Sequence, residues 1–155
     1  MTEVRTVRAE LDDLDALVLL FDGYRRFYRQ KADPDGARAF LAERFKRGES
    51  VIFLAVVDGA AAGFTQLYPS FSSVSLKRLW VLNDLFVDPN ARRAGVGRAL
   101  LARAERWAAE TQAKGLILST AITNAAAQHL YESCGWVRDD EYFHYHRSSD
   151  VGPTP

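Results

Sequence analysis

The sequence has little cysteine, no excess of either charge and no long apolar run. Its single cysteine, Cys134, excludes an intrachain disulfide and suits a reducing compartment. Twenty basic and twenty acidic side chains give a formal net charge of zero, whereas binding to nucleic-acid phosphates usually shows as a basic excess. No apolar run approaches the roughly 20 residues of a membrane span, and the first residues do not resemble a secretory signal. These absences predict a cytoplasmic protein with no nucleic-acid partner and no membrane partner.

What is present is the composition of an ordinary globular protein. Hydrophobic residues make up 48% of the 155 positions and charged residues 26%. A chain of this length is long enough to bury a core as one unit. We therefore expect a single domain over residues 1–147, followed by a frayed tail over residues 148–155, where no core pattern is visible.

The first third of the chain predicts one strand and two helices. Weak alternation over residues 4–8 predicts the strand, and apolar positions at helical spacing over residues 11–28 predict the first helix. Asp33-Pro34 marks the start of a second helix, because proline is favoured at the first helical position. Gly48 is expected to end it.

The middle of the chain predicts an antiparallel meander. Residues 51–57 form an apolar run that stops at Asp58-Gly59, a strong hairpin signal. The partner strand is expected over residues 62–68, where Pro69 should interrupt the ladder. A third strand is expected over residues 76–87.

The remaining residues predict a parallel junction and two closing strands. A helix over residues 97–112 is followed by an apolar strand over 116–121, and this order favours parallel pairing. Thr123-Asn124 is expected to cap a short helix. Final strands are expected at residues 136–137 and 141–147. The predicted fold class is α/β, with a mixed sheet covered by about four helices.

The loop that follows the third strand of the meander has the features of an anion site. Arg92 to Gly97 is basic, contains two glycines and leads into a helix. Unpaired N–H groups and the helix dipole favour phosphate at such a position, and glycine lets the phosphate approach the backbone. An ordinary helix-entry loop is one alternative. A dinucleotide site is another, although Leu100 occupies the place of its third small residue.

Two separate motifs resemble those of the GNAT superfamily of N-acetyltransferases. The first is similar to its acyl-CoA signature R/Q-x-x-G-x-G/A and reads Arg92-x-x-Gly95-x-Gly97. The second is similar to a later motif of the family, with Trp in place of Phe, and reads Asn124-x-x-Ala127-x-x-Leu130-Tyr131-x-x-x-Gly135-Trp136. The resemblance extends over almost the whole chain and is nearest to the histone/polyamine-type branch and its bacterial relatives. It implies a mostly antiparallel central sheet with a splayed parallel pair.

The resemblance implies acetyl-CoA as cosubstrate and no metal. Backbone amides of the loop would bind the pyrophosphate, with added charge from Arg93 or Arg98. The strand ending at Val87 would offer main-chain contacts to the pantetheine arm, including one N–H as oxyanion donor. Asn124 would contact the same arm. The implied cofactor residues, with Asn124 and Tyr131, are Leu85, Phe86, Val87, Arg92, Arg93, Ala94, Gly95, Val96, Gly97 and Arg98.

The resemblance also implies a general acid and leaves the base open. Tyr131 would protonate the departing thiolate, although an inward tyrosine on a short helix is otherwise plain core. An alkylammonium has a pKa near 10.4 and must lose a proton before it attacks. The polyamine-type relatives carry Glu-Asp where this chain has Asn83-Asp84, so Asp84 is the candidate base. Because side chains alternate along a strand, Asp84 is expected on the face opposite Asn83.

The remaining expectations concern the acceptor pocket and the oligomeric state. Tyr24 and Tyr28 are core residues by default, but the resemblance places the acceptor pocket in this region, with Asn83 beside it. Residues 139–141 are acidic and read as a solvated turn or as a rim for a cationic acceptor. His144 and His146 read as a surface pair rather than metal ligands. Homodimers are common in the family, and the aromatic residues just before His146 are candidate dimer contacts.

The function implied is acetyl transfer to a primary amine by direct attack in a ternary complex. The acceptor would be a polyamine, another small-molecule amine or a lysine of a protein. A different hypothesis is a non-catalytic acyl-CoA-binding sensor or regulatory module, since Asn83 cannot act as a base.

Overall fold

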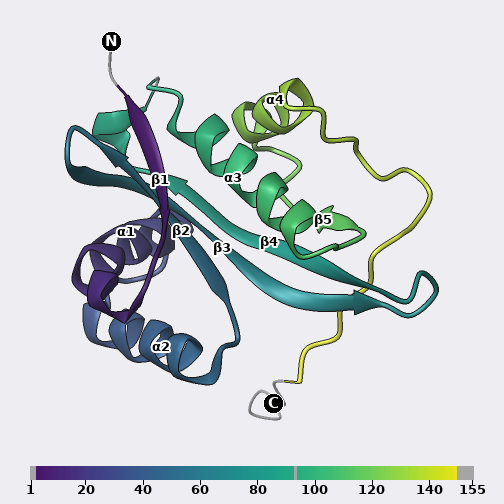
Figure 1. The fold of residues 1–155 in the computed structure, drawn as a ribbon, viewed down its shortest axis with the longest axis horizontal. Coiled ribbons are helices and arrows are strands. Elements are labelled where there is room, and N and C mark those ends of the chain that lie inside the picture. Colours follow the sequence, from purple (N-terminus) through teal and green to yellow (C-terminus); the bar gives the residue numbers. More distant parts are fainter. Residues whose placement is uncertain (1–2, 93, 150–155) are drawn as a thin grey trace, which may run out of the picture.

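The computed structural model describes residues 3–92 and 94–149, which are organised around one five-stranded sheet (Figure 1). The strands follow chain order, antiparallel from β1 to β4 and parallel between β4 and β5. The strands are β1 Val4–Arg8, β2 Val51–Val57, β3 Ala60–Ser72, β4 Lys77–Val87 and β5 Gly115–Ile117. The α-helices of this part of the chain are α1 Leu14–Phe27, α2 Pro34–Arg47, α3 Val96–Glu110 and α4 Ala125–Ser133. The 3-10 turns are η1 Leu11–Asp13 and η2 Pro89–Ala91. The predicted mixed α/β fold is confirmed.

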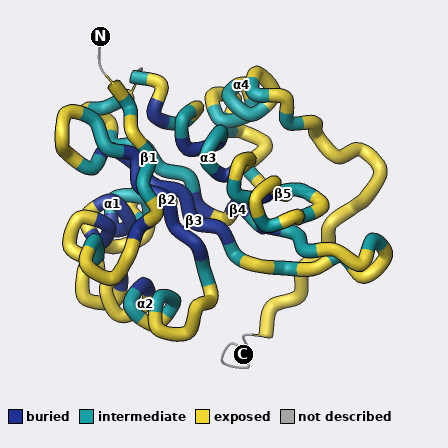
Figure 2. The backbone as a smooth tube through the Cα atoms, in the orientation of Figure 1, coloured by how far each residue is buried: buried dark blue, intermediate teal, exposed yellow. Residues whose placement is uncertain are grey.

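Helices cover the sheet on both faces, and each face has its own core. On one face the apolar side of α3 packs on β2, β3 and β4, and α4 lies beside α3 (Figure 1). On the other face α1 and α2 pack on the alternate residues of β2 and β3. The most deeply buried chain therefore runs through β2 and β3, the dark blue stretch of Figure 2.

Most of the expected helix ends are where local sequence places them. Asp33 caps α2, since its side chain accepts a hydrogen bond from the Gly36 N–H at 2.9 Å. Gly48 closes α2 in the left-handed conformation with φ of 62°. The first predicted helix is divided, because η1 precedes α1.

The prediction that Pro69 ends its strand is wrong. β3 continues through Pro69, which pairs with Trp80, and reaches Ser72. The ladder between β2 and β3 ends at Val51 opposite Leu67, so β3 is an edge strand beyond that point. An edge strand tolerates a proline because the missing N–H faces no neighbouring strand.

The ladder between β3 and β4 contains a bulge at Asn83. Gln66 pairs with Asp84 and the next residue, Leu67, pairs with Leu82, which leaves Asn83 without a partner. Strict alternation is therefore lost at this point. Leu82 belongs to the core on the α3 face, whereas Asp84 contacts Gln66 on the α1 face.

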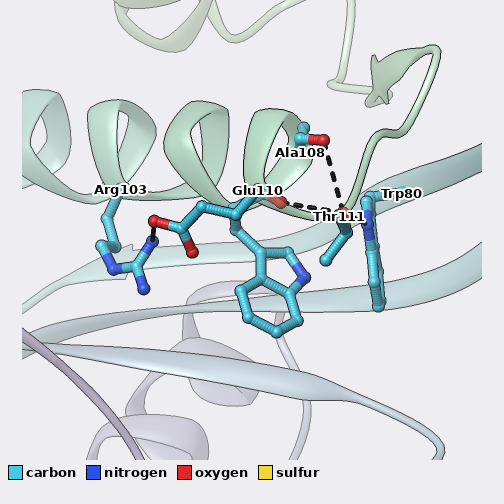
Figure 3. A network of polar contacts seen from close by, with 6 residues as sticks. Trp80, Arg103, Ala108, Glu110 and Thr111 are labelled. Atoms are coloured by element: carbon cyan, nitrogen blue, oxygen red, sulfur yellow. Dashed lines mark hydrogen bonds and ion pairs between the residues drawn. The ribbon is translucent and has the colours of Figure 1, made fainter.

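A polar network fastens the C-terminal end of α3 to the sheet (Figure 3). The Trp80 ring N–H donates to the Thr111 hydroxyl at 2.9 Å, and that hydroxyl donates to the Trp107 carbonyl at 2.8 Å. Arg103 pairs with Glu110 at 3.7 Å on the same helix. The bond from Trp80 joins the C-terminal end of α3 to β4, whereas the other two contacts lie within the helix and its cap.

Two expectations for the last third of the chain are wrong. The parallel strand β5 ends at Ile117 rather than Ala121. Residues 136–149 form neither of the two predicted strands, and they run outside the sheet (Figure 1). Alternating side chains alone do not make a strand, because a strand also needs a neighbour for its backbone hydrogen bonds.

Candidate active site

A cleft lies where β4 and β5 separate. Its volume is about 390 Å³, and it is bounded by the ends of α1 and β4, the start of α3, the residues after β5, and α4. The lining residues are Tyr24, Phe27, Tyr28, Leu82, Asn83, Leu85, Phe86, Val87, Arg92, Gly95, Val96, Gly97, Arg98, Leu118, Ser119, Thr120, Asn124, Ala126, Ala127, Leu130 and Tyr131. The cleft therefore brings together most of the residues that the two sequence motifs and the third strand indicated.

One wall of the cleft is an open strand edge. β4 pairs with β5 only from Leu79 to Val81, and no strand of the described chain lies beside β4 beyond that point on this side. Leu85, Phe86 and Val87 lie in the open part and line the cleft. Unpaired backbone groups at a strand edge bind an extended ligand that offers its own donors and acceptors.

The start of α3 forms a second wall. Gly95 is the N-cap with φ of 79°, and it has no side chain to satisfy the free N–H groups of the first helical turn. At Gly97 a Cβ atom would lie 3.1 Å from Leu130 Cδ2, so a side chain here would press on α4. The two glycines thus have different roles, one in the backbone conformation and one in the space between α3 and α4.

Positive charge at this end of the cleft comes from the same loop. Arg92 and Arg98 both line the cleft and are exposed. Arg98 donates to the Ser133 hydroxyl at 2.8 Å and to Cys134 Sγ at 3.4 Å, which ties α3 to the end of α4. Arg93 lies outside the described residues. The side chain of Val96 is in the core, and Ala94 does not line the cleft.

α4 places Asn124 and Tyr131 on the opposite side of the cleft. Asn124 caps the helix, because its side chain accepts from the Ala127 N–H at 3.1 Å. Two helical turns later Tyr131 lines the cleft, with its ring centroid 6.1 Å from that of Trp136. Burial raises the pKa of Tyr131 above its ordinary value, with a further rise from Tyr28. The hydroxyl is therefore held in its protonated form at neutral pH.

Asp84 lies behind the wall of the cleft and is 3% exposed. Gln66 Nε2 donates to one of its carboxylate oxygens and Asn83 Nδ2 to the other, the latter at 2.9 Å. The expected orientation of Asn83 and Asp84 to opposite faces is wrong, because the bulge lets their side chains meet. Burial raises the pKa of Asp84, and hydrogen bonds from Gln66, Tyr24 and Asn83 partly offset that rise.

Aromatic residues of α1 form the end of the cleft nearest Asp84. Tyr24, Phe27 and Tyr28 all line it, and none of the three is buried. Tyr24 packs edge-on against Tyr28 at 5.0 Å between centroids, and its hydroxyl donates to the Asn83 carbonyl at 3.3 Å. Burial first, and then the Asp84 carboxylate, raise the pKa of Tyr24. Tyr24 is thus the group between the buried carboxylate and the cleft.

Sequence reasoning missed several residues of this region. Gln66 reads from the sequence as one position of a strand, and only the β3–β4 pairing brings it to Asp84. Leu118, Ser119 and Thr120 also line the cleft. They lie directly after β5, and the splayed parallel pair that the family resemblance implies was the signal that could have found them.

Metal and membrane features are absent from the residues that the structure describes. No group of three or more histidine, cysteine, aspartate or glutamate side chains is placed to hold a metal ion. Nor is any helix in residues 3–92 and 94–149 both long and apolar enough to cross a membrane.

Comparison with known proteins decides the family. Residues 17–136 match the acetyltransferase (GNAT) family model. The chain belongs to the GNAT family. It is 49% identical over 138 residues to the uncharacterized N-acetyltransferase YhfO of Bacillus subtilis (strain 168), covering 89% of this chain and 93% of that protein. As the motifs predicted, the protein is an N-acetyltransferase.

Solved structures of the GNAT type agree with this fold. A crystal structure of a probable acetyltransferase has a TM-score of 0.91 and 45% identity, and the match covers 96% of this chain and 99% of that one. The aminoglycoside N-acetyltransferase AAC(6')-Iy in complex with CoA has a TM-score of 0.78 at 19% identity, covering 95% and 96% of the two chains. The second likeness shows the fold alone.

Proposed function

We propose that this GNAT protein binds acetyl-CoA along the cleft and transfers the acetyl group to a primary amine. The observation that carries the proposal is the continuity of one cleft. It begins at the N-terminus of α3, follows the open edge of β4, passes Tyr131 and ends at the aromatic residues of α1. The start of α3 suits an anionic group, and the open edge of β4 suits an extended arm that contains amides. Tyr131 suits a leaving thiolate, and the aromatic end suits an amine.

The pyrophosphate would lie at the start of α3. The free N–H groups of the first turn and the side chains of Arg92 and Arg98 supply donors and positive charge. The pantetheine arm would pair with the backbone of Leu85, Phe86 and Val87, and one of these N–H groups would serve as the oxyanion donor to the thioester. The proposal that CoA is the ligand is supported by AAC(6')-Iy, which shares the fold and was solved in complex with CoA.

The chemical step would be direct attack of the amine on the thioester. The nitrogen lone pair forms the C–N bond, the C–S bond breaks, and the thiolate leaves as free CoA. Tyr131 would donate its hydroxyl proton to the sulfur, because its raised pKa keeps that proton in place until the thiolate departs. An alkylammonium loses two protons on the way to the amide, one before it attacks and one as the C–S bond breaks. The second loss balances the proton that Tyr131 gives to the sulfur, and the first requires a base.

Asp84 would take the proton from the amine through Tyr24. The carboxylate is too deeply buried to meet the amine directly, whereas the Tyr24 ring lines the cleft. The Tyr24 hydroxyl donates to the backbone carbonyl of the adjacent Asn83, and Tyr24 is one of the groups that lower the pKa of Asp84. Tyr24 would pass its own proton to Asp84 and accept one from the amine. The raised pKa of Asp84 makes it a stronger base than an exposed aspartate.

The variant Tyr24→Phe tests this relay. The substitution keeps the ring and removes the hydroxyl, so kcat/KM is expected to fall about 10- to 100-fold at pH 7. The loss should shrink as the pH approaches the pKa of the acceptor, because more amine is then already neutral. A defect that is equal at all pH values would show that the hydroxyl binds the substrate and carries no proton.

The acceptor class is proposed as a small amine, a polyamine or a lysine side chain. The aromatic end of the cleft favours a cationic or amphipathic amine, since Tyr24, Phe27 and Tyr28 offer ring faces. The test is a screen of polyamines, aminoglycosides, amino acids and lysine peptides, with release of free thiol from acetyl-CoA as the readout. Turnover with at least one acceptor is expected.

The same screen separates the enzyme from a sensor. A non-catalytic module would bind acetyl-CoA in isothermal titration calorimetry yet release no thiol with any acceptor. Asn83 is the residue that favours this alternative, because it stands where the polyamine-type relatives carry a carboxylate. The cytoplasmic location and the homodimer predicted from the sequence remain predictions.

A further inference from the structure

Gln66 is a fully buried polar residue beside the proposed base. Its exposed fraction is 0%, as it is for the residues on either side, Thr65 and Leu67. Within the described part of the chain, Gln66 Nε2 donates to a carboxylate oxygen of Asp84, whereas Gln66 Oε1 has no hydrogen-bond partner. An unpaired buried acceptor costs stability, and an apolar side chain of similar size would avoid that cost. The bond to Asp84 is therefore what this residue supplies and an apolar core residue could not.

The pairing of β3 with β4 fixes the bond between Gln66 and Asp84. The two residues stand opposite each other in the ladder, directly beside the bulge at Asn83. Gln66 holds one carboxylate oxygen and Asn83 Nδ2 holds the other at 2.9 Å, so the carboxylate is kept in one orientation. Of the two amides, Asn83 is exposed and Gln66 is not. The bond from Gln66 is therefore the less screened by water and the stronger of the two.

The charged and titratable groups around Asp84 leave this bond as the main opponent of burial. Those groups come from α1, α2 and β3, and they are Tyr24, Tyr28, Arg44 and Tyr68. Tyrosine is neutral at pH 7, and burial raises the pKa of Tyr24 above its ordinary value and that of Tyr68 to about 12. Arg44 is paired with Glu43 and Glu49. Burial raises the pKa of Asp84, and the bond from Gln66 is the largest of the effects that lower it.

We propose that Gln66 is a positioning residue for the acetyl transfer, which holds the Asp84 carboxylate in place and sets the pH above which it accepts a proton. This inference rests on the proposed function, in which Asp84 takes the amine proton through Tyr24. Gln66 does not line the cleft, so it acts through Asp84 rather than on the substrates. A hydrogen bond to the charged form keeps a carboxylate ionised at a lower pH. With Gln66 in place, Asp84 is therefore an active base over a wider range of pH.

The pH dependence of kcat/KM tests this role. Gln66→Met keeps the approximate size and removes the donor, so the limb at lower pH should move up by about one unit. That shift is a loss of about 10-fold in kcat/KM below the limb, while the KM for acetyl-CoA should stay unchanged. Gln66→Glu should move the limb further, because two carboxyl groups in contact do not readily both ionise. Thermal melting of each variant checks that the fold is retained.

Thr65→Val is the matched control for these variants. Thr65 is equally buried, and its hydroxyl donates to the backbone carbonyl of Asp84 at 2.8 Å rather than to the carboxylate. Its substitution is expected to leave the limb unchanged. A shift in Thr65→Val equal to that in Gln66→Met would overturn the proposal, because the effect would then come from disturbance of the strand pair.

Titration of the Asp84 carboxyl carbon by ¹³C NMR separates this proposal from the proposed function. The signal is assigned by its loss in Asp84→Asn, and it reports the pKa of Asp84 without any turnover. The pKa in Gln66→Met is expected about one unit above that of the wild type. An unmoved pKa overturns the proposal whether or not an acceptor is found. A pKa that moves while the kinetic limb stays also overturns it, since Asp84 is then not the base, and acetyl transfer itself would stand. A lack of turnover with every acceptor is a separate result, which overturns the proposed function and with it the role of Gln66 in catalysis.

Discussion

Asp84 shows how a single residue acquires unusual chemistry from its surroundings. Three side chains from three elements surround it, Gln66 from β3, Asn83 from the bulge and Tyr24 from α1. A carboxylate this deeply buried is disfavoured in its charged form, so its pKa rises despite these hydrogen bonds. As a consequence, the free energy of unfolding depends on pH through the titration of Asp84. Replacing Asp84 with asparagine, which has the same shape but does not titrate, removes that contribution.

The variant Asp84→Asn is expected to flatten that dependence. Because the pKa of Asp84 is higher in the folded than in the unfolded chain, the folded protein binds more protons between the two values. The free energy of unfolding of the wild type therefore falls as the pH rises from about 4, the unfolded pKa, through the folded pKa. The stability of Asp84→Asn relative to the wild type should rise over the same interval, measured by urea unfolding. Asp12→Asn, an exposed carboxylate, is the control. Parallel curves for wild type and Asp84→Asn would contradict the burial effect.

Tyr131→Phe is expected to reduce kcat without loss of cofactor. The hydroxyl is needed only when the thiolate departs, so kcat should fall about 100-fold while the Kd for CoA changes less than about threefold. Steady-state kinetics and calorimetry measure the two quantities. Tyr142→Phe removes a hydroxyl from an exposed ring and serves as the control. A rate near that of the wild type across the pH range would exclude Tyr131 as the general acid.

At the scale of elements, the start of α3 depends on two glycines that act differently. Gly95 has φ of 79° and open space around it, so Gly95→Ala strains only the backbone. We expect a cost of about 1 kcal/mol, or roughly 2–4 °C in Tm for a chain of this size. Gly97→Ala places its Cβ against Leu130, which must move with α4. For Gly97→Ala we expect the affinity for CoA to fall about 10-fold, whereas Tm should change less than it does in Gly95→Ala.

Calorimetry and thermal melting of both variants test this division. The contrast is the informative result, because both positions belong to the same sequence motif. Equal loss of affinity with equal loss of stability would mean that the two glycines serve one purpose. In that case the packing of α3 on α4 would not control the cleft.

At the scale of the whole molecule, the cleft joins elements from both ends of the chain, from α1 to α4. A ligand that spans it should therefore stabilise the entire fold. At 100 times its Kd, CoA is expected to add about 2.7 kcal/mol, which corresponds to roughly 5–10 °C in Tm. ATP and NAD at the same concentration should add less, because neither has the pantetheine arm that the open edge of β4 suits. A larger shift with NAD or ATP would favour a nucleotide-binding protein.

Local sequence determined the features whose geometry depends on neighbours in the chain. The turn at Asp58-Gly59, the cap at Asp33 and the loop from Arg92 to Gly97 all follow from backbone preferences within a few residues. The two family motifs predicted the fold and most of the cleft in another way, through the resemblance that they carry. The roles of Asn124 and Tyr131 were likewise implied by the resemblance, and their seven-residue spacing is consistent with a common side of one helix.

Only the tertiary structure decided the features that depend on pairing between distant residues. The bulge at Asn83 exists because β3 and β4 pair in a particular register, and that register brings Gln66 and Tyr24 to Asp84. Pro69 remains in a strand because β2 has already ended beside it. Residues 136–149 were predicted to form two strands, but no strand of the described residues pairs with them. A strand is a property of two segments, so one segment's sequence does not determine whether it forms.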